Sequence, residues 1–286
     1  MKIQTISIVV PTKGCINNCP FCVSRMHENN YNVKINCFEI KKRLKWAIIN
    51  GVNTCIFTGT GEAFQNKKFL EIMLNIFKEM NHPFPNVEFQ TTGVMLLNND
   101  KNVYFLKNLG VNTISLSVSD IFLDERNMNI IGVPEKLRFK LKDLIDYLKT
   151  YDFNIRLSLN MLNSYDKYGI IYYVSTILDK CKDLGADQVT FRKMYYYNNN
   201  VEQSRWVKEN QCSNETLSVI KEYIEKFGEF LYKLPFGASV YSISNMSVVI
   251  DDDCMSKNNN EALKYVILRE NGKLYVRWDD EGSLIF

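Results

Sequence analysis

Three cysteines, Cys15, Cys19 and Cys22, form a C-x3-C-x2-C pattern directly after an apolar, strand-like segment. Three thiolates can bind three irons of a four-iron cluster and leave the fourth iron open to a substrate or cofactor. A zinc site and three inert thiols are the alternatives. Structural zinc usually has four ligands in paired motifs, and the only histidines are His27 and His82. The pattern therefore favours an iron–sulfur cluster with one open iron.

A second motif, Thr60-Gly61-Glu62, follows the strand-like residues 53–58. Together with Gly59, Gly61 would let the backbone approach a ligand closely, because glycine has no side chain. Glu62 would then place a carboxylate at the carboxyl end of a strand, where open α/β folds bind their ligands. Taken alone, the motif also fits an ordinary loop between a strand and a helix.

Strand-like and helix-like segments alternate along most of the chain and give six βα units. The predicted strands cover 3–11, 53–58, 87–92, 113–119, 154–162 and 188–194, and the predicted helices cover 38–50, 67–81, 102–109, 135–151, 168–184 and 214–231. This alternation is typical of parallel strands joined by crossover helices. It predicts an α/β fold, either a partial (β/α)6 TIM-like barrel or an open wound sheet.

Polar residues recur at every second position of four predicted strands. Because side chains alternate across a strand, each set shares one face: Gln90 and Thr92; Ser115, Ser117 and Ser119; Arg156, Ser158 and Asn160; and Thr190, Arg192 and Met194. The opposite faces are apolar and must meet the helices. Polar groups buried without partners cost about 1–3 kcal/mol each, so the pattern favours a barrel whose lumen holds a polar ligand. A wound sheet whose polar residues pair among themselves is the alternative.

The last fifty residues break the alternation. Segments 238–244 and 247–251 look like short strands, and Asn271-Gly272 is a hairpin turn signal between two further strands. We therefore predict a barrel domain over residues 1–235 and a small C-terminal antiparallel β cap over residues 236–286, packed on the barrel.

The two motifs and the strand count together resemble the radical S-adenosylmethionine (SAM) superfamily. Cys15, Cys19 and Cys22 resemble its cluster loop, and Thr60-Gly61-Glu62 is similar to its Gly-Gly-Glu motif, with threonine for the first glycine. The order of the motifs looks closest to the molybdenum-cofactor-enzyme-like branch, without that branch's C-terminal second cluster. The family fold is a partial (β/α)6 barrel, in agreement with the independent strand count.

This resemblance implies a [4Fe-4S] cluster, SAM and a radical mechanism. A reduced cluster would cleave SAM to a 5′-deoxyadenosyl radical, which abstracts hydrogen from a substrate. An external donor of the flavodoxin or ferredoxin type would supply the electron. Glu62 matches the residue that contacts the methionine amino group, and Phe21 the position whose backbone meets the adenine. Further SAM or substrate contacts would come from Ser115, Ser117, Ser158, Asn160, and Arg192 or Met194.

The sequence says less about the identity of the substrate than about the cofactors. A compact chain without an appended recognition domain favours a small-molecule or nucleotide substrate. Radical SAM modification of a peptide or RNA (epimerisation, cross-linking or methylation) is one alternative, and a non-catalytic iron–sulfur or zinc-binding protein is another. Cys212 and Cys254 are candidate hydrogen donors to a substrate radical; buried or bystander thiols are the alternative.

The composition indicates the cellular environment in which this chemistry would occur. The 35 basic and 32 acidic residues give a net charge of +3, which is too balanced to indicate a nucleic-acid or membrane surface. Eight cysteines without a secretory signal favour a reducing cytoplasm. An exposed cluster would be sensitive to oxygen, so we also expect an anaerobic setting.

Overall fold

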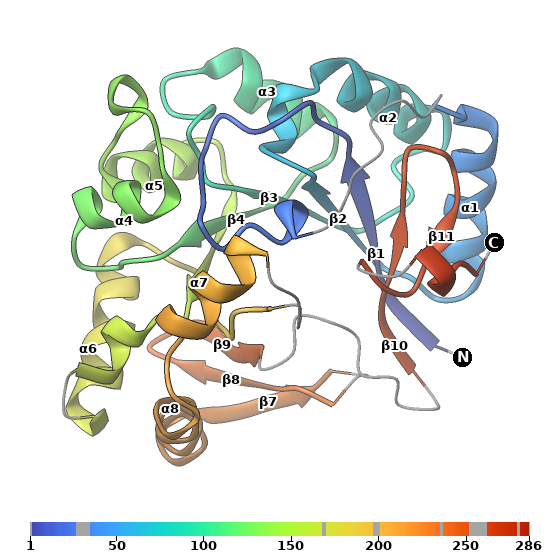
Figure 1. Cartoon of the computed structure of the whole chain (residues 1–286). Helices are drawn as coiled ribbons and strands as arrows, with labels where there is room; N and C mark the ends of the chain where they lie inside the picture. The colour runs from blue at the N-terminus through green and yellow to red at the C-terminus, as the bar shows by residue number, and fades with distance from the viewer. Residues whose placement is uncertain are drawn as a thin grey trace.

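A computed structural model describes residues 2–26, 35–167, 170–196, 201–234, 237–251, 262–278 and 281–285 of the chain. Its centre is a curved sheet, with helices α1 to α6 on the outside (Figure 1). The C-terminal strands lie at the bottom and on the right of that view. Cys254, a predicted hydrogen donor, lies outside the described residues.

Six parallel strands form the middle of the sheet, each paired with the next along the chain. They are β1 (Lys2–Val10), β2 (Thr54–Gly59), β3 (Asn86–Thr91), β4 (Thr113–Val118), β5 (Asn154–Asn160) and β6 (Gln188–Arg192). This arrangement confirms the α/β fold predicted as a partial (β/α)6 barrel. The register pairs Val10 with Gly59, so the loops that follow β1 and β2 begin side by side.

The helices of the described chain are α1 (Cys37–Ile49), α2 (Lys67–Glu79), α3 (Asp100–Asn108), α4 (Asp124–Ile131), α5 (Leu141–Lys149), α6 (Ile170–Leu184), α7 (Glu202–Asn210) and α8 (Asn214–Phe227). Helices α1 to α6 lie on the outside of the sheet (Figure 1), whereas Trp206 of α7 packs against Phe21 of the cysteine loop. Short 3-10 turns are η1 (Val23–Arg25), η2 (Ala63–Gln65), η3 (Glu135–Leu137), η4 (Asn163–Lys167) and η5 (Glu281–Ser283). Helix α2 is an example: the Asn66 side chain accepts from the Phe69 N–H at 3.1 Å at its start, and its apolar side, with Phe69, Met73 and Phe77, is buried.

Several helix predictions differ from the structure. The helix predicted over 135–151 begins only at Leu141, after a 3-10 turn. The helix predicted to run to residue 231 ends at Phe227, because Gly228 takes an extended backbone conformation and strand β7 (Glu229–Lys233) follows. Helices α4 and α7 were not predicted, since their short, polar sequences lack a clear apolar stripe.

The polar faces of the strands turn inward, as the alternation predicts. On β4 the outward residues Ile114, Leu116 and Val118 are completely buried in the helix-facing core. On the inner side, Ser115 and Ser158 are 3% exposed. The described sheet therefore separates an apolar outer layer from a polar lumen.

The C-terminal strands extend the sheet at both edges. They are β7, β8 (Ser239–Ile243), β9 (Met246–Asp251), β10 (Ala262–Leu268) and β11 (Leu274–Tyr275). The strand order of the whole described sheet is β11-β10-β1-β2-β3-β4-β5-β6-β9-β8-β7. The expected antiparallel pairs are present as β8–β9 and β10–β11, and β7, which was not predicted as a strand, pairs antiparallel with β8. Two parallel pairings, β6 with β9 and β1 with β10, were not anticipated. The division at residues 235 and 236 stays a prediction.

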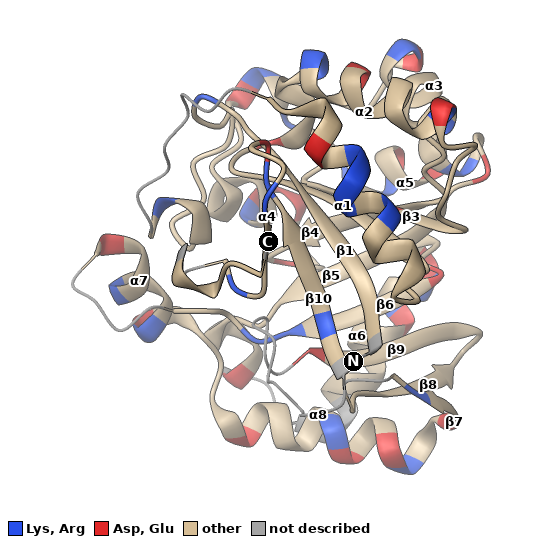
Figure 2. Cartoon of the chain, turned by 90° about the vertical axis from the view of Figure 1, so that its right-hand side faces the viewer, with Lys and Arg blue, Asp and Glu red and all other residues tan. Residues whose placement is uncertain are grey.

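The outer surface mixes both signs of charge. Figure 2 shows basic and acidic residues interspersed along the helices in that view, including α8. None of the helices in the described ranges has the length and apolar character needed to cross a bilayer.

Candidate functional site

The three motif cysteines lie in the loop between β1 and η1, and neighbouring elements hold this loop at several points. The Asn18 N–H lies 3.1 Å from the Ile131 carbonyl and 3.2 Å from that of Gly132, at the end of α4. The Cys19 thiol donates to the same Ile131 oxygen at 3.3 Å. On the other side, the Ile16 N–H donates to Gln65 Oε1 at 2.8 Å. The loop is therefore held between α4 and η2.

Gly132 is required for this contact. Its φ of 71° is in the left-handed region that favours glycine, and it ends α4 there. A Cβ at this position would lie 2.9 Å from the Asn18 backbone. Neither Gly132 nor α4 was identified from the sequence as part of the site.

The thiols of Cys15, Cys19 and Cys22 are half-buried and free of disulfides. Burial raises the pKa of Cys19 to about 12, and repulsion from the Cys22 and Cys15 thiolates adds to this. Burial also raises the pKa of Cys15, against the hydrogen bonds from the Asn17 and Glu62 backbone. Three thiolates that repel one another in this way are stabilised when cationic irons lie among them.

The positions of the candidate metal ligands distinguish a single-ion site from a cluster site. No three His, Cys, Asp or Glu side chains within the described ranges converge as ligands of a single ion. Thiolates of a four-iron cluster bind separate irons and need not converge on one point.

The loop containing Gly61 and Glu62 touches the cysteine loop directly. The Glu62 N–H donates to Cys15 Sγ at 3.1 Å. A Cβ on Gly61 would lie 2.5 Å from both the Gly14 carbonyl oxygen and Thr12 Oγ1, and 3.1 Å from the Cys15 Cβ. Only glycine at position 61 lets the two loops come this close. The two motifs, separated in sequence, therefore form one site at the carboxyl ends of β1 and β2.

Thr60 strengthens the same junction. Its Oγ1 accepts from the Thr12 N–H at 2.9 Å, and the Thr60 N–H donates to the Val10 carbonyl at 3.1 Å. Thr60 stands where the resembling family has its first glycine. Its hydroxyl adds the hydrogen bond from the Thr12 N–H, which glycine, with no side chain, could not accept.

The Glu62 carboxylate is 4% exposed and points to the end of β3. It accepts from Thr91 Oγ1 at 2.6 Å, from the Thr92 N–H at 3.1 Å and from Thr92 Oγ1 at 3.0 Å. Burial raises the pKa of Glu62, and these hydrogen bonds oppose the rise. The contact of Glu62 with the SAM amino group stays a prediction.

Asn17, which sequence reasoning missed, connects this network to the cysteine loop. It is 2% exposed, and its Nδ2 donates to Thr92 Oγ1 at 2.8 Å. Its Oδ1 is buried and has no hydrogen-bond partner among the described residues. Asn17, Thr92 and Glu62 therefore form a continuous chain of hydrogen bonds from the cluster loop to the acidic residue.

The predicted strand residues meet inside the barrel. Asn160, 4% exposed, donates from Nδ2 to Ser117 Oγ at 3.2 Å and to Ser119 Oγ at 3.0 Å. Ser115 lies on the same face of β4, and the buried Oγ of Ser158 has no hydrogen-bond partner in the described part of the chain. An unsatisfied buried hydroxyl in this lumen fits a site that a polar ligand completes.

Met194 follows the end of β6 and lies in an apolar cluster with Met26, Leu162 and Val207, against which Phe21 packs. The structure thus brings Phe21 and Met194 together beside the cysteine loop. Arg192, the last residue of β6, lines a cavity that is described below.

The Cys212 N–H donates to the carbonyl of Met161, the residue after Asn160, at 3.0 Å. Cys212 is 5% exposed and belongs to the large hydrophobic core. Burial raises its pKa to about 12, and the nearby Asp166 adds to the effect. The structure does not place Cys212 among the residues that line the described cavity. Its role as a hydrogen donor stays a prediction.

Comparison with known proteins agrees with this geometry. The sequence model of the radical SAM superfamily matches residues 9–168, more than half of the 286 residues. The chain belongs to the radical SAM superfamily. Enzymes of this family bind a [4Fe-4S] cluster and SAM, and the three cysteines and the Gly61–Glu62 loop fit those two groups. The subfamily is not resolved, and none of the curated proteins matches the chain in sequence.

Solved structures of radical SAM enzymes share the fold. Streptococcus suis SuiB bound to S-adenosylmethionine aligns with a TM-score of 0.59 at 13% identity, over 96% of this chain and 60% of SuiB. Native anSMEcpe with bound AdoMet and a Cp18Cys peptide aligns with a TM-score of 0.58 at 11% identity, over 96% of this chain and 73% of that one. The chain thus spans about 60% of the length of SuiB.

Proposed function

We propose that this radical SAM enzyme cleaves SAM reductively and abstracts hydrogen from a small-molecule or nucleotide substrate held in the barrel. The observation that carries this proposal is the contact between the two motifs. Cys15 and Glu62 meet through a 3.1 Å hydrogen bond at the carboxyl ends of adjacent strands, above a polar lumen.

The chain's own residues have distinct tasks in this proposal. Cys15, Cys19 and Cys22 would hold the cluster. The Glu62 N–H stabilises the negative charge of the Cys15 thiolate by donating to it. Ser117 and Asn160, fixed by their mutual hydrogen bond, offer polar contacts to a sugar hydroxyl. When bound, the reduced cluster and SAM together supply a 5′-deoxyadenosyl radical, and the surrounding barrel shields it from water.

The test is anaerobic reconstitution followed by incubation with dithionite and SAM. We expect 5′-deoxyadenosine and methionine from the wild-type protein. Substitution of any one motif cysteine by alanine should remove the iron–sulfur absorbance and the SAM cleavage together. Cys37→Ala is the matched control, because Cys37 is an exposed thiol at the start of α1. Full SAM cleavage by Cys19→Ala would refute the assignment.

Glu62→Ala separates SAM binding from cluster binding. The cluster should still assemble, because the backbone N–H that faces Cys15 remains, while SAM affinity falls. Unchanged SAM affinity would remove Glu62 from the SAM site.

A peptide substrate is the second candidate. Two of the similar structures contain peptides: SuiB bound to its precursor peptide SuiA, and anSMEcpe with a Cp18Cys peptide. Their likeness to this chain is one of fold. Mass spectrometry of small molecules and of peptides after incubation with the reduced enzyme and SAM would distinguish the two classes. The reductant is proposed to be a flavodoxin or ferredoxin, and reduction of the cluster by either protein tests this.

A further inference from the structure

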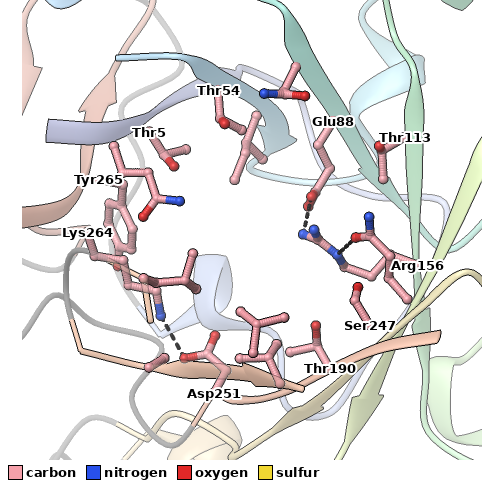
Figure 3. Close-up of a pocket in the computed structure, with 18 of the residues that line it drawn as sticks. Thr5, Thr54, Glu88, Thr113, Arg156, Thr190, Ser247, Asp251, Lys264 and Tyr265 are labelled. Atoms are coloured by element: carbon pink, nitrogen blue, oxygen red, sulfur yellow. Dashed lines mark hydrogen bonds and ion pairs between the residues drawn. The ribbon is translucent and has the colours of Figure 1, made fainter. Parts of the chain in front are cut away.

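A polar cavity of about 450 Å³ opens at the end of the barrel opposite the cofactor loops (Figure 3). Thr5, Thr54 and Thr113, near the starts of their strands, contribute to its wall. The cavity continues inward to Arg192 and Asp251, the last residues of β6 and β9. Its volume is within the range of about 300–1,000 Å³ that is usual for small-molecule sites.

One charged pair in the wall already has its partners. Arg156 forms an ion pair with Glu88, which also accepts from Gln90 Nε2 at 3.0 Å. Arg156 Nε donates to Gln188 Oε1 at 2.8 Å. Figure 3 shows Glu88 and Arg156 facing each other on one side of the cavity. This side offers no surplus charge to a ligand.

The other side has more cationic than acidic groups. Lys264 Nζ lies 2.6 Å from Asp251 Oδ1, whereas Arg192 Nε lies 3.9 Å from Asp251 Oδ2. The Arg192 Nε is buried and has no hydrogen-bond partner within the described residues. One carboxylate thus faces two cations, and the closer cation is Lys264. The excess positive charge of the described lining is located at Arg192.

We propose that this cavity binds the substrate, and that the substrate carries an anionic group, carboxylate or phosphate, which Arg192 binds. This assignment of a substrate class rests on the proposed function. A guanidinium fits the oxygens of either group through paired hydrogen bonds. The hydroxyls of Thr54, Thr190 and Ser247 line the remaining wall and can hydrogen-bond the polar body of the ligand.

The position of Arg192 connects the cavity to the cofactor end of the barrel. In the sheet register Arg192 pairs with Asn160, which contacts Ser117 and Ser119. A ligand held by Arg192 therefore lies next to the strand residues expected to contact SAM. Arg192 is therefore the residue through which the cavity adjoins the proposed radical site.

Calorimetric titration of the reconstituted full chain tests this proposal with three probes: inorganic phosphate, malonate and adenosine monophosphate. We expect at least one of them to bind the wild-type protein, and more weakly as salt is added. Arg192→Gln should weaken binding at least tenfold, and Arg192→Lys, which keeps the charge, only a few-fold. Arg43→Gln is the matched control, since Arg43 pairs with Glu39 on the outer helix α1.

A second variant changes binding in the opposite direction. Asp251→Asn removes the carboxylate that attracts both Lys264 and Arg192. We expect it to bind the same anion several-fold more tightly, which a damaged fold would not do. Tighter binding of malonate than of inorganic phosphate would identify the group as a carboxylate. Tighter binding of adenosine monophosphate than of either would identify a phosphate on a sugar.

The outcomes separate this inference from the proposed function. Formation of 5′-deoxyadenosine by a wild-type protein that binds none of the three probes would overturn the anion site alone. Equal binding by Arg192→Gln and wild type would overturn it as well. Anion binding by a protein that never cleaves SAM would overturn the proposed function and, with it, the assignment of this cavity to a substrate.

Discussion

Replacing Thr92 by valine should disconnect the cysteine loop from Glu62. Valine keeps the shape of threonine but lacks the hydroxyl, which accepts from Asn17 Nδ2 at 2.8 Å and donates to Glu62 Oε2 at 3.0 Å. Asn17 would then keep a buried amide without an acceptor, beside an Oδ1 that already has no partner among the described residues. Glu62 would keep Thr91 Oγ1 and the Thr92 N–H.

The expected cost follows from these two losses. A hydrogen bond to a charged group contributes about 1.5–3 kcal/mol, and a buried donor left unsatisfied costs about 1–3 kcal/mol. Because one hydroxyl makes both contacts, the losses overlap, and we expect the free energy of unfolding to fall by about 2–4 kcal/mol. SAM should bind about tenfold more weakly, equivalent to about 1.4 kcal/mol, since Glu62 keeps its hydrogen bonds from Thr91 Oγ1 and the Thr92 N–H.

Urea unfolding of the apo protein under anaerobic conditions measures the first effect, and calorimetric titration of the reconstituted protein with SAM measures the second. Thr113→Val is the matched control, because Thr113 lies at the start of β4 and its hydroxyl, among the described residues, makes a single 3.3 Å contact, with Asn112. A cycle with Asn17→Ala should give a coupling energy of about 0.5–3 kcal/mol. Additive effects, or a Thr92→Val protein as stable as the Thr113→Val control, would refute the connection.

Three further predictions concern the loop around Gly61, the partly buried carboxyl group of Glu270, and Cys212. Gly61→Ala would place a Cβ 2.5 Å from the Gly14 carbonyl oxygen; we expect low iron content after reconstitution and a loss of about 1–3 kcal/mol in stability. Gly51→Ala should also lower stability, because the φ of Gly51 is 86°, but it should leave the iron content unchanged, because no atom lies within 4 Å of the added Cβ. Burial raises the pKa of Glu270, so its contribution to stability is present below its unfolded pKa and is lost as the pH rises through the raised value; Glu270→Gln should flatten this part of the pH profile of unfolding. Cys212→Ala should leave product formation intact and cost about 1 kcal/mol of stability if the thiol only packs in the core, whereas loss of product with normal SAM cleavage would identify it as the hydrogen donor.

The alternation of side chains was sufficient to predict the polar lumen. Ser115, Ser158 and Asn160 were assigned to the inner face from their spacing alone, and all three are buried on the inner side of the described sheet. The order of the predicted elements also indicates that Cys15 and Glu62 each follow a parallel strand, and hence that they lie at the same end of the barrel. It could not give their contact, because the 3.1 Å hydrogen bond depends on the register of β1 against β2.

Parts of the site that depend on pairing between distant segments were missed. Helix α4 has a polar sequence, and its contribution comes from backbone carbonyls at Ile131 and Gly132, which side-chain patterns do not reveal. Asn17 meets Thr92 across 75 positions of sequence. No local pattern around Asn17 distinguishes it from Asn18, whose side chain instead accepts from Arg25.

Strands β9 and β10 explain why the lumen has charged residues at its open side. β9 pairs in parallel with β6, and β10 pairs in parallel with β1, so these two strands, which are close in sequence, lie on opposite sides of the six central strands (Figure 1). Asp251 on β9 and Lys264 on β10 then face each other across the opening and form the 2.6 Å ion pair. A lumen lined only by the hydroxyls of β1 to β6 would bind polar ligands with little preference for charge. Because β9 and β10 bring a single acid between two cations, Arg192 Nε is left without a hydrogen-bond partner among the described residues, and an additional anion could supply one.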